Sequence, residues 1–527
     1  MWGMGLIEQW VKRGIPTQEI GYLAFTKAAA VEATTRVSDG RFNADDYPNF
    51  RTIHSLCFRL MREGGVEKRV VMPGDMKKFA KESGLEGEYA IQAGEDLAEA
   101  YQSLQIDAKS IWDNCRTAYM LSRISSRSVD DLDRAKTEIS REAIRRMGWG
   151  DTDAYVTFVQ KYEAFKESNG LVDFTDMLEY PLRNRCAVDC RKVIVDEGQD
   201  LCALHFKIVE RLFDDEAEEV WHIGDDDQAI FGFSGASAEE FLSQIGGCKK
   251  VVLRQTHRFG QEIVDFSERI IRRVANRIEK DVIGKPDSPC AVSVSGEFAP
   301  THDDGFILHR HVRGCQQLGA RFINAGIPFT NERGRSPLSS ANRIKAFEAM
   351  NELADGKKIK MGGVVLLVED LMPSFWVSDD ETQKIRLVVH GAKKKLAEAS
   401  GMTDVTLDDL VSIKIVTKDG AAVVKERKYE VLKHEPDLRY YEKLRKSGYR
   451  LAPGGPTITT IHGSKGREKN RVTVFAESGR KCWQDPDNEH RLAYVAATRT
   501  KEYLTICHEQ TLDWATVPYD YPIEVAV

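Results

Sequence analysis

The stretch VIVDEGQD at residues 193–200 decides the interpretation of this chain. It opens with three β-branched residues, a pattern typical of a parallel strand that is buried on both faces. Asp196 and Glu197 follow at the carboxyl end of that strand, where open α/β sheets bind their ligands. One carboxylate there can hold Mg²⁺ through water while its neighbour orients an attacking water. An ordinary solvated strand end is the other interpretation, so the neighbouring motifs must decide.

A second strand with polar residues at its end follows at VWHIGDDDQAIFGFSGA, residues 220–236. Two strands would thus deliver carboxylates and the amide of Gln228 to one edge of a sheet. A glutamine there can hydrogen-bond a γ-phosphate or the attacking water. Phe231 and Phe233 come next, and planar aromatic rings can stack on unpaired bases. Ordinary core packing is the alternative interpretation of these two rings.

Composition indicates a soluble chain of several domains. It has 527 residues, of which 42% are hydrophobic and 30% charged, too many for a single core. The sequence has no apolar run of membrane-spanning length and no pattern of a signal peptide, so we expect a cytoplasmic protein without a membrane partner. Its ten cysteines are scattered and predict no zinc site. The net charge of −7 does not exclude nucleic acid, because a narrow positive channel suffices for backbone binding.

Strand and helix patterns alternate in two blocks, and a helix-rich segment interrupts each block. The first block has a helix at residues 5–13, a strand at 21–25, a helix at 27–36, and strands at 193–195 and 220–223, and a further strand is expected at 250–253. The second has a strand, a helix and an AGIP turn before a further strand within residues 306–329, and then the motifs TITTIHGSKGREKNRVTVF and EHRLAYVAATRTKEYLTIC. Residues 73–170 are mainly helical. Residues 338–448 are helix-rich with two β-like segments at 363–368 and 411–424.

Taken in order, these segments resemble the UvrD/Rep-like superfamily 1 helicases over about residues 5–508. YLAFTKAAA resembles motif Ia of that family, RTIHSLCFRL motif Ib, VIVDEGQD the Walker B motif, GDDDQAIFGFSGA motif III, and LRQTHR, TIHGSKGREKNRV and EHRLAYVAATR motifs IV, V and VI. DFTDML at residues 173–178 is similar to a family segment before Walker B. The resemblance implies an α/β fold with two RecA-like parallel-sheet motor domains, each with a mainly helical insertion.

The resemblance also implies domain boundaries. The first RecA-like domain would comprise residues 1–72 and 166–249, N-terminally incomplete, with a helical insertion at 73–165. The second would comprise residues 250–337 and 449–527, with an insertion at 338–448.

The family uses ATP and Mg²⁺ to move along single-stranded DNA, and its motifs imply catalytic roles here. Asp196 would hold Mg²⁺, Glu197 would position or activate water, and Gln228 would sense the γ-phosphate. Arg258 and Arg499 would be arginine fingers, because a planar guanidinium neutralises the charge that develops on the transferred phosphoryl group.

Motif V implies further contacts to the nucleotide. Glu468 would bind the ribose, and the amide of Gly466 would approach a phosphate. For Lys465 two interpretations stay open, a solvated side chain and a contact to a DNA phosphate.

The DNA path implied by the resemblance would bind phosphates and bases without base specificity. The residues at the matching positions are Thr26, Lys27, Thr52, His54, Phe231, Phe233, Thr460 and His462. Single-stranded DNA or a junction of single and double strands would be the partner, and the sequence names no protein partner.

The family's GxxxxGK(S/T) loop, which should directly precede the first helix, is absent from the sequence. We expect an N-terminal segment to be missing, rather than a natural loss of the loop, because the other ATP-contacting motifs remain. Ser234 stands where many relatives have arginine, and His257 replaces a common tyrosine, which puts those two contacts in doubt. The chain after motif VI is too short for a nuclease domain.

We therefore expect an ATP-dependent DNA helicase or translocase, of 3′-to-5′ polarity by resemblance and with DNA repair as one setting. The alternative is a DNA-binding remnant that does not hydrolyse ATP. A nuclease is the weakest of the three because no further carboxylate cluster follows the motifs.

Overall fold

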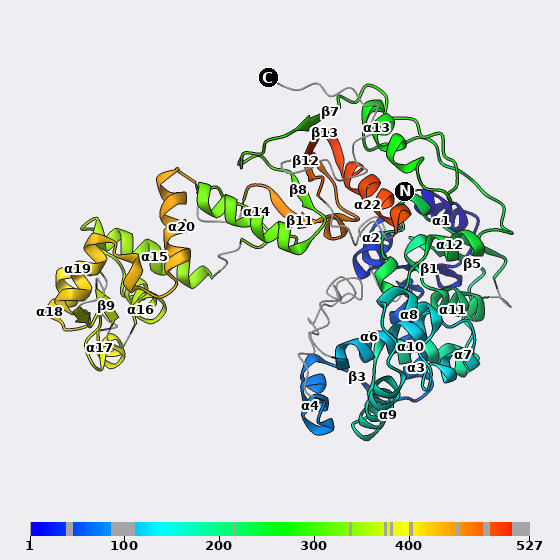
Figure 1. Cartoon of the computed structure of the whole chain (residues 1–527), viewed down its shortest axis with the longest axis horizontal. Coiled ribbons are helices and arrows are strands. Elements are labelled where there is room, and N and C mark those ends of the chain that lie inside the picture. Colours follow the sequence, from blue (N-terminus) through cyan, green and yellow to red (C-terminus); the bar gives the residue numbers. More distant parts are fainter. Residues whose placement is uncertain are drawn as a thin grey trace. The chain divides into compact units, whose positions relative to one another are not determined.

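The computed structural model describes residues 2–37, 46–85, 111–213, 217–336, 340–373, 377–379, 383–399, 404–449, 454–477 and 485–508. Two compact units make up the chain (Figure 1). Unit 1 comprises Met1–His257, Ser267–Gly284 and Arg480–Val495, and unit 2 comprises Arg258–Phe266, Lys285–Gly479 and Ala496–Val527.

Unit 1 is built on a parallel sheet of four strands in the order β2-β1-β5-β6. The strands are β1 (Ile20–Ala24), β2 (Phe50–Thr52), β5 (Lys192–Val195) and β6 (Glu219–His222). β5 is buried along its whole length, as its β-branched run predicts. Because β5 and β6 are parallel neighbours, with Val195 opposite His222, the residues that follow them meet at one edge.

Helices cover both faces of this sheet. On one face α1 (Trp2–Lys12) packs Ile7 and Trp10 against Ile194, and α2 (Lys27–Val37) lies in the same core. On the other face Val193 and Val195 pack with side chains of the helices α3, α10, α11 and α12. These are Ile53–Glu63, Phe174–Arg183, Ala203–Phe213 and Ala238–Gln244. The next helix along the chain, α13 (Gln261–Ile271), is divided between the two units.

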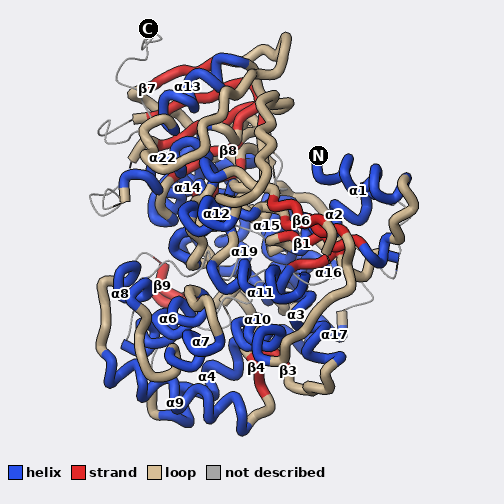
Figure 2. Tube along the Cα trace, turned by 90° about the vertical axis from the view of Figure 1, so that its right-hand side faces the viewer, coloured by secondary structure: helices blue, strands red, loops and turns tan. Residues whose placement is uncertain are grey.

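The helical segment of unit 1 begins and ends at a pair of very short parallel strands, β3 (Arg69–Val70) and β4 (Leu171–Val172). Between them lie α4 (Pro73–Ser83), α6 (Ile111–Ile124), α7 (Val129–Arg134), α8 (Arg141–Met147) and α9 (Thr152–Ser168), as Figure 2 shows. The helical prediction for residues 73–170 is thus confirmed where residues are described, and residues 86–110 lie outside them.

Unit 2 has a parallel sheet of five strands in the order β11-β8-β12-β13-β7. The strands are β7 (Ala291–Ser295), β8 (Phe306–His309), β11 (Thr457–Thr460), β12 (Lys469–Phe475) and β13 (Thr500–Cys507). Its helices include α14 (Val312–Ala325) and α21 (Ile461–Ser464), whereas α22 (Pro486–Ala497) lies mainly in unit 1. The strand expected after the AGIP turn is reduced to a single bridge between Thr330 and Thr457. The predicted fold class, two α/β domains with parallel sheets, is confirmed.

The second helix-rich segment corrects two predictions. It contains α15 (Ala341–Ala354), α16 (Met361–Leu366), a π-helical turn (Leu367–Leu371), β9 (Val377–Asp379), β10 (Gln383–Ile385), α17 (Ala392–Glu398), α18 (Leu407–Ser412), α19 (Lys418–Glu426) and α20 (Glu435–Lys446). The β-like interpretation of residues 363–368 and 411–424 is therefore wrong. Val364, Leu367, Val368 and Leu371 are buried together at helical spacing, and this packing overrides their β propensity.

The predicted strand at residues 250–253 is also wrong in this structure. These residues pair with no strand and stay exposed, including Val251 and Leu253. A strand needs a partner for its backbone groups, and none lies beside this segment among the described residues. In the same ranges, no helix combines the length and the apolar character that a bilayer crossing requires.

Candidate nucleotide and nucleic-acid site

Asp196 is held at the carboxyl end of β5 by contacts from both sides of its carboxylate. Its Oδ1 accepts a hydrogen bond from the amide of Glu197 at 3.0 Å, and Tyr22 Oη donates to its Oδ2. Its own amide donates to the carbonyl of Leu23 at 2.8 Å. The position of this carboxylate is therefore fixed by β1 and by the turn after β5.

The electrostatic setting of Asp196 suits a cation ligand. Burial raises the pKa of Asp196 and the neighbouring Glu197 raises it further, while the hydrogen bond from Tyr22 acts in the opposite direction. Burial makes the ionised form of this carboxylate unfavourable, and a nearby cation would offset that free-energy cost. Within the described ranges no three His, Cys, Asp or Glu side chains gather into a ligand set. A single carboxylate such as Asp196 has the chemistry of a Mg²⁺ ligand in nucleotide sites, where water and phosphate oxygens supply the other ligands.

Glu197 adopts a backbone conformation that is unusual for a non-glycine residue. Its φ is 53°, in the left-handed region, and it precedes the short 3₁₀ helix Gly198–Asp200. Such conformations cost energy and cluster at functional sites. The Glu197 carboxylate accepts a hydrogen bond at 2.5 Å from Nε2 of Gln199, which is completely buried.

Gln199 links the residues after β5 to those after β6. Its Oε1 accepts a hydrogen bond from the amide of Asp225 at 2.9 Å. The carboxylate of Asp225 in turn accepts a hydrogen bond from Gln228 Nε2 at 2.7 Å. Glu197, Gln199, Asp225 and Gln228 thus form one chain of hydrogen bonds, here named the carboxylate relay. It fixes the positions of Glu197 and Gln228 relative to each other.

A close packing contact keeps the two strand ends together beneath this relay. A Cβ on Gly198 would lie 2.7 Å from Phe241 Cε2. A Cβ on Gly224 would lie 2.8 Å from Phe241 Cζ and 2.6 Å from Gln199 Oε1. Only glycine therefore fits at these two positions without displacing the ring or the amide.

The three aspartates after Gly224 do not form an uncompensated acidic patch. Lys280 Nζ lies 3.0, 2.6 and 2.8 Å from carboxylate oxygens of Asp225, Asp226 and Asp227, and Arg277 forms two hydrogen bonds to Asp227. Burial alone would raise the pKa of Asp225, but Lys280 and the hydrogen bond from Gln228 outweigh this and lower it. Asp225 therefore stays ionised as an acceptor for Gln228.

In unit 2, Arg258, Glu468 and Lys501 form an ion-paired cluster, although 243 positions separate the first from the last. Arg258 Nε lies 2.5 Å from Glu468 Oε2, and Lys501 Nζ lies 2.7 Å from Glu468 Oε1. Burial alone would raise the pKa of Glu468, but Lys501 and Arg258 outweigh this and lower it. Glu468 and Lys501 line a polar cavity of about 570 Å³ together with Arg471 and Tyr503.

Arg499 lies close to this cluster through Thr498. Arg258 donates to the carbonyl of Thr498 at 3.1 Å, and Arg499 donates to the hydroxyl of Thr498 at 3.2 Å. Arg499 is buried, whereas about a third of the Arg258 side chain is exposed. Gly466 has a φ of +78° and open space around its α-carbon, so its backbone is accessible. Unit 2 thus brings Arg258, Glu468 and Arg499 together, as their motifs imply.

Three threonines expected on the DNA path share one local structure. Each begins a helix, and its hydroxyl accepts a backbone hydrogen bond: Thr26 from Ala29, Thr52 from Ser55 and Thr460 from Gly463. A capping hydroxyl keeps its own hydrogen available for an acceptor such as a phosphate oxygen. The side chains of Lys27 and Phe233 lie outside the described residues.

The remaining DNA-path candidates are more buried than a binding role alone would predict. His54 Nε2 is buried without a hydrogen-bond partner, and its ring packs edge-on to His205 at 5.3 Å between centroids. Burial lowers the pKa of His54, so the ring is neutral and cannot supply a positive charge to a phosphate. Phe231 is buried and stacks on Phe25, and His462 is buried as well.

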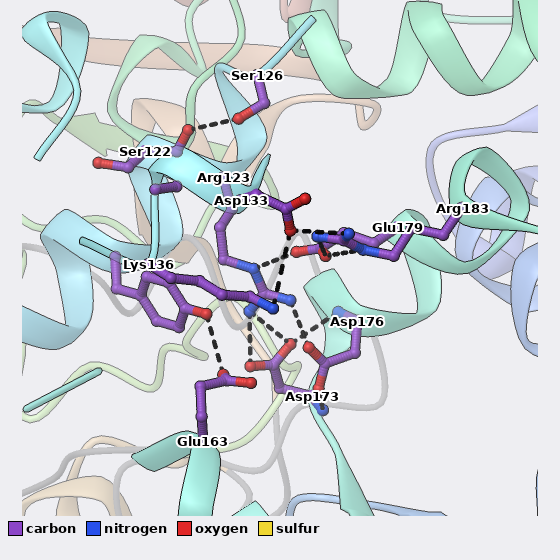
Figure 3. Close-up of polar contacts among 12 residues, drawn as sticks. Ser122, Arg123, Ser126, Asp133, Lys136, Glu163, Asp173, Asp176, Glu179 and Arg183 are labelled. Carbon is purple, nitrogen blue, oxygen red and sulfur yellow. Dashed lines mark hydrogen bonds and ion pairs between the residues drawn. The ribbon is translucent and has the colours of Figure 1, made fainter. Parts of the chain in front are cut away.

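In unit 1, the DFTDML segment anchors a buried charge network, which Figure 3 shows. Arg123, only 2% exposed, is bonded to Asp173, Asp176 and Glu179, and Lys166 adds further ion pairs to the two aspartates. Burial alone would raise the pKa of Asp173, but Arg123 and Lys166 outweigh it and hold that pKa well below its ordinary value. The network joins α6, α9 and α10.

Sequence reasoning missed Tyr22, Gln199 and Lys501. Gln199 stands within the quoted VIVDEGQD stretch, so its nearness to the carboxylates was the available signal. Tyr22 and Lys501 adjoin other motifs but reach their partners only through strand pairing, which their local sequence does not specify.

Comparison with known proteins gives two family matches. The UvrD/REP helicase N-terminal domain matches residues 6–248, and the UvrD-like helicase C-terminal domain matches residues 457–507, together more than half of the chain.

Three similar proteins all carry the name DNA helicase. The putative ATP-dependent DNA helicase YjcD of Bacillus subtilis is 22% identical over 440 residues, 66% of this chain and 56% of the relative. UvrD1 of Mycobacterium tuberculosis, named an ATP-dependent DNA helicase, is 24% identical over 60% of this chain and 44% of the relative. DNA helicase II of Escherichia coli is 27% identical over 35% of this chain and 28% of the relative. The matches thus span at most 56% of these three relatives. On the two family matches and these relatives, the chain belongs to the UvrD/REP-like helicase superfamily.

Proposed function

We propose that this chain forms the motor of an ATP-dependent DNA helicase or translocase that moves 3′-to-5′ along single-stranded DNA. Its partner would be single-stranded DNA or a junction of single and double strands, and its setting the cytoplasm, with DNA repair as one use. The RecA-like domain boundaries given above belong to this proposal.

The carboxylate relay carries the proposal. Hydrolysis of a nucleoside triphosphate needs a metal ligand, a group that accepts a proton from water and a group that orients that water. Asp196, Glu197 and Gln228 supply these groups at one sheet edge, and Gln199 fixes the distance between Glu197 and Asp225. Such a preorganised set is favoured for phosphoryl transfer, where positioning and electrostatics supply most of the catalysis.

Each group would act on a different part of the reaction. Asp196 would hold Mg²⁺, which neutralises charge on the phosphates. Glu197 would accept a proton from the attacking water, which Gln228 orients. Arg258 and Arg499 would neutralise charge on the transferred phosphoryl group.

Residues of motif V would also hold the nucleotide. Glu468 would bind the ribose and the amide of Gly466 a phosphate oxygen. Arg258, now paired with Glu468, would exchange that carboxylate for a phosphate when ATP binds.

Binding of the nucleotide phosphates also needs a loop of backbone N–H donors. No GxxxxGK(S/T) pattern occurs in the 527 residues, so the backbone N–H cradle of such a loop is not among them. We propose that an additional polypeptide segment supplies it. The same observation supports the second candidate function, a single-stranded DNA-binding protein that does not turn over ATP.

Two measurements on the chain as it stands test the proposal. A labelled oligonucleotide should bind with micromolar or weaker affinity, and binding should weaken strongly between about 50 and 200 mM salt because phosphates exchange counterions for protein contacts. ATP hydrolysis should be very slow with or without DNA. No binding at low salt, or binding indifferent to salt, would contradict the DNA path.

Addition of an N-terminal segment with GxxGTGKT separates the two candidate functions. DNA-stimulated ATP hydrolysis by the extended chain supports the motor, and DNA binding without hydrolysis supports the second candidate. A DNA-stimulated turnover of about 10 s⁻¹ by the unextended chain, which is ordinary for enzymes, would show that the loop is not needed.

A further inference from the structure

A carboxylate lies among the DNA-path residues of unit 2, where the other candidates are a hydroxyl and an imidazole. Glu332 comes from the turn that follows the bridge between Thr330 and Thr457. Its Oε2 accepts a hydrogen bond from Thr459 Oγ1 at 3.3 Å. The carboxylate therefore reaches the end of β11, where Thr460 is expected to bind a DNA phosphate.

The space over the α-carbon of Gly463 locates this carboxylate more closely. A Cβ built on Gly463 would lie 2.5 Å from Glu332 Oε2 and 3.2 Å from Thr460 Oγ1, so both oxygens border the same small space. Thr460 Oγ1 already accepts a hydrogen bond from the Gly463 amide at 3.1 Å, which leaves its own hydrogen to be donated to an acceptor. A phosphate oxygen that binds Thr460 from the side of Gly463 would therefore lie next to Glu332.

Backbone contacts on two sides hold Glu332 in this position. Arg467 donates to the carbonyl of Glu332 at 2.7 Å and also to the carbonyl of Gly463, so one guanidinium joins the two backbone segments. Thr330, two residues before Glu332, pairs with β11, because its carbonyl accepts a hydrogen bond from the Ile458 amide at 2.8 Å. Neither contact involves the carboxylate of Glu332, so removal of its charge should leave the turn in place.

The charge of Glu332 determines its effect on a bound strand. Repulsion between a carboxylate and a phosphate about 5 Å apart weakens binding about fourfold at the dielectric constant of water, and more at a partly buried site. A hydrogen bond from the phosphate cannot offset this repulsion, because a phosphodiester has no hydrogen to donate. Glu332 therefore opposes the contact that the Thr460 hydroxyl offers.

We propose that Glu332 limits how tightly unit 2 holds single-stranded DNA at Thr460. Its carboxylate sets a negative charge beside the backbone phosphate, which then binds less tightly than the hydroxyl alone would allow. The inference rests on the proposed function, because it requires the strand to pass Thr460. A motor that moves along DNA must release each phosphate that it binds, and a weakened contact makes this release faster.

Glu332→Gln tests the proposal on the chain of 527 residues. Glutamine keeps the size of the side chain and an oxygen that accepts the hydrogen bond from Thr459, and it removes the charge. A labelled single-stranded oligonucleotide should bind this variant at least about threefold more tightly than the parent chain at about 50 mM salt. The gain in affinity should shrink at about 200 mM salt, because salt screens the repulsion.

Glu297→Gln is the matched control within unit 2. Glu297 is exposed and follows β7, and β7 and β11 are the two opposite edges of the five-stranded sheet. Four strand spacings, roughly 19 Å, separate these edges, which is longer than the Debye length of about 10 Å at 0.1 M salt. The control removes the same charge but should change DNA affinity by less than about twofold. Equal gains from the two substitutions would show a general effect of net charge and overturn the proposal.

A second variant, Glu332→Ala, removes the charge together with the hydrogen bond to Thr459. It should give a similar gain in DNA affinity, and thermal denaturation of each variant shows that it is folded. Unchanged or weaker binding by both folded variants, or a gain that does not depend on salt, would overturn the role of the Glu332 charge.

The outcomes separate this inference from the proposed function. Salt-dependent binding by the parent chain without a gain from Glu332→Gln would overturn the inference alone and leave the DNA path in place. Binding by neither the parent chain nor the variants at low salt would overturn the DNA path and, with it, the inference. Binding detected only after Glu332→Gln would support both.

Discussion

Arg258 Nε lies 2.5 Å from Glu468 Oε2, so the proposed arginine finger is ion-paired with the residue proposed to bind the ribose. The two side chains are 34% and 37% exposed, and solvent screens such a pair. The pair therefore contributes little stability, on the order of 1 kcal/mol or less. It is an exchangeable contact, and a nucleotide that offers both a ribose hydroxyl and a phosphate can replace both partners.

Glu468→Ala should weaken ATP binding about tenfold in a chain extended with the phosphate loop, because a hydrogen bond to a charged acceptor is lost. Binding of inorganic triphosphate should be unchanged, since it has no ribose. Isothermal titration with both ligands measures this difference. Equal losses for the two ligands would contradict a ribose contact.

Glu197→Gln in the same extended chain should lower DNA-stimulated hydrolysis on the order of 10²–10⁴-fold, because the amide cannot accept the proton of the attacking water. Nucleotide binding should persist, since Asp196 still serves as the metal ligand. Steady-state hydrolysis and binding of a non-hydrolysable analogue measure the two effects. Hydrolysis at the parental rate would remove Glu197 from the catalytic role and with it the Walker B assignment.

Asp196→Asn should stabilise the nucleotide-free chain at neutral pH, raising its melting temperature by roughly 2 °C. The pKa of Asp196 is raised in the folded state, so folding becomes less favourable as pH rises through the interval between the unfolded and folded pKa values. Above that interval the free-energy cost of burying the ionised Asp196 carboxylate is constant. Below about pH 4 this cost disappears, and the advantage of asparagine disappears with it. Thermal denaturation at pH 7 and pH 4 tests this. A destabilised variant at pH 7 would show that the hydrogen bonds to Asp196 outweigh its burial.

Arg123→Met should destabilise unit 1 by about 3–5 kcal/mol, because Asp173, Asp176 and Glu179 lose a shared buried cation. Denaturant unfolding measures the loss.

The matched control is Arg145→Met. Its side chain is 72% exposed and paired with Glu142, so the change should stay within about 0.5 kcal/mol. Equal effects of the two substitutions would show that the network adds no stability.

The stability that the network adds should also depend on pH. Since the pKa of Asp173 is lowered on folding, the contribution of Asp173 to the free energy of unfolding is complete above its ordinary pKa and is lost as pH falls below it.

The strands that carry the site could be predicted from sequence because their signals are local. β5 combines a β-branched run with a carboxylate pair, and β6 ends at a glycine and three aspartates. The predicted strand at residues 250–253 does not form, although its apolar sequence is equally typical of a strand. A strand needs a hydrogen-bonded neighbouring strand, which its own sequence does not specify. The segment around Val364 became a helix for a related reason, since its burial at helical spacing depends on helices far away in the sequence.

The candidate site could be predicted only in its motif residues. Arg258, Glu468 and Arg499 were expected from their motifs, but Lys501 and Gln199 act through contacts that depend on the folded arrangement of neighbouring strands. The burial of His54 and Phe231 could not be predicted either, because His205 and Phe25, which cover them, come from other elements.

The packing of Phe241 beneath Gly198 and Gly224 has a consequence for how the site keeps its dimensions. One aromatic ring, with no polar atom of its own, packs against both the turn after β5 and the turn after β6, which are joined directly by a hydrogen bond from the Gly198 amide to the Ile223 carbonyl at 2.9 Å. A larger side chain at either glycine would have to displace this ring or the turns themselves, so the close approach of the two turns depends on apolar packing as well as on the hydrogen bonds of the relay. The geometry of the polar groups at this edge thus depends in part on the hydrophobic core.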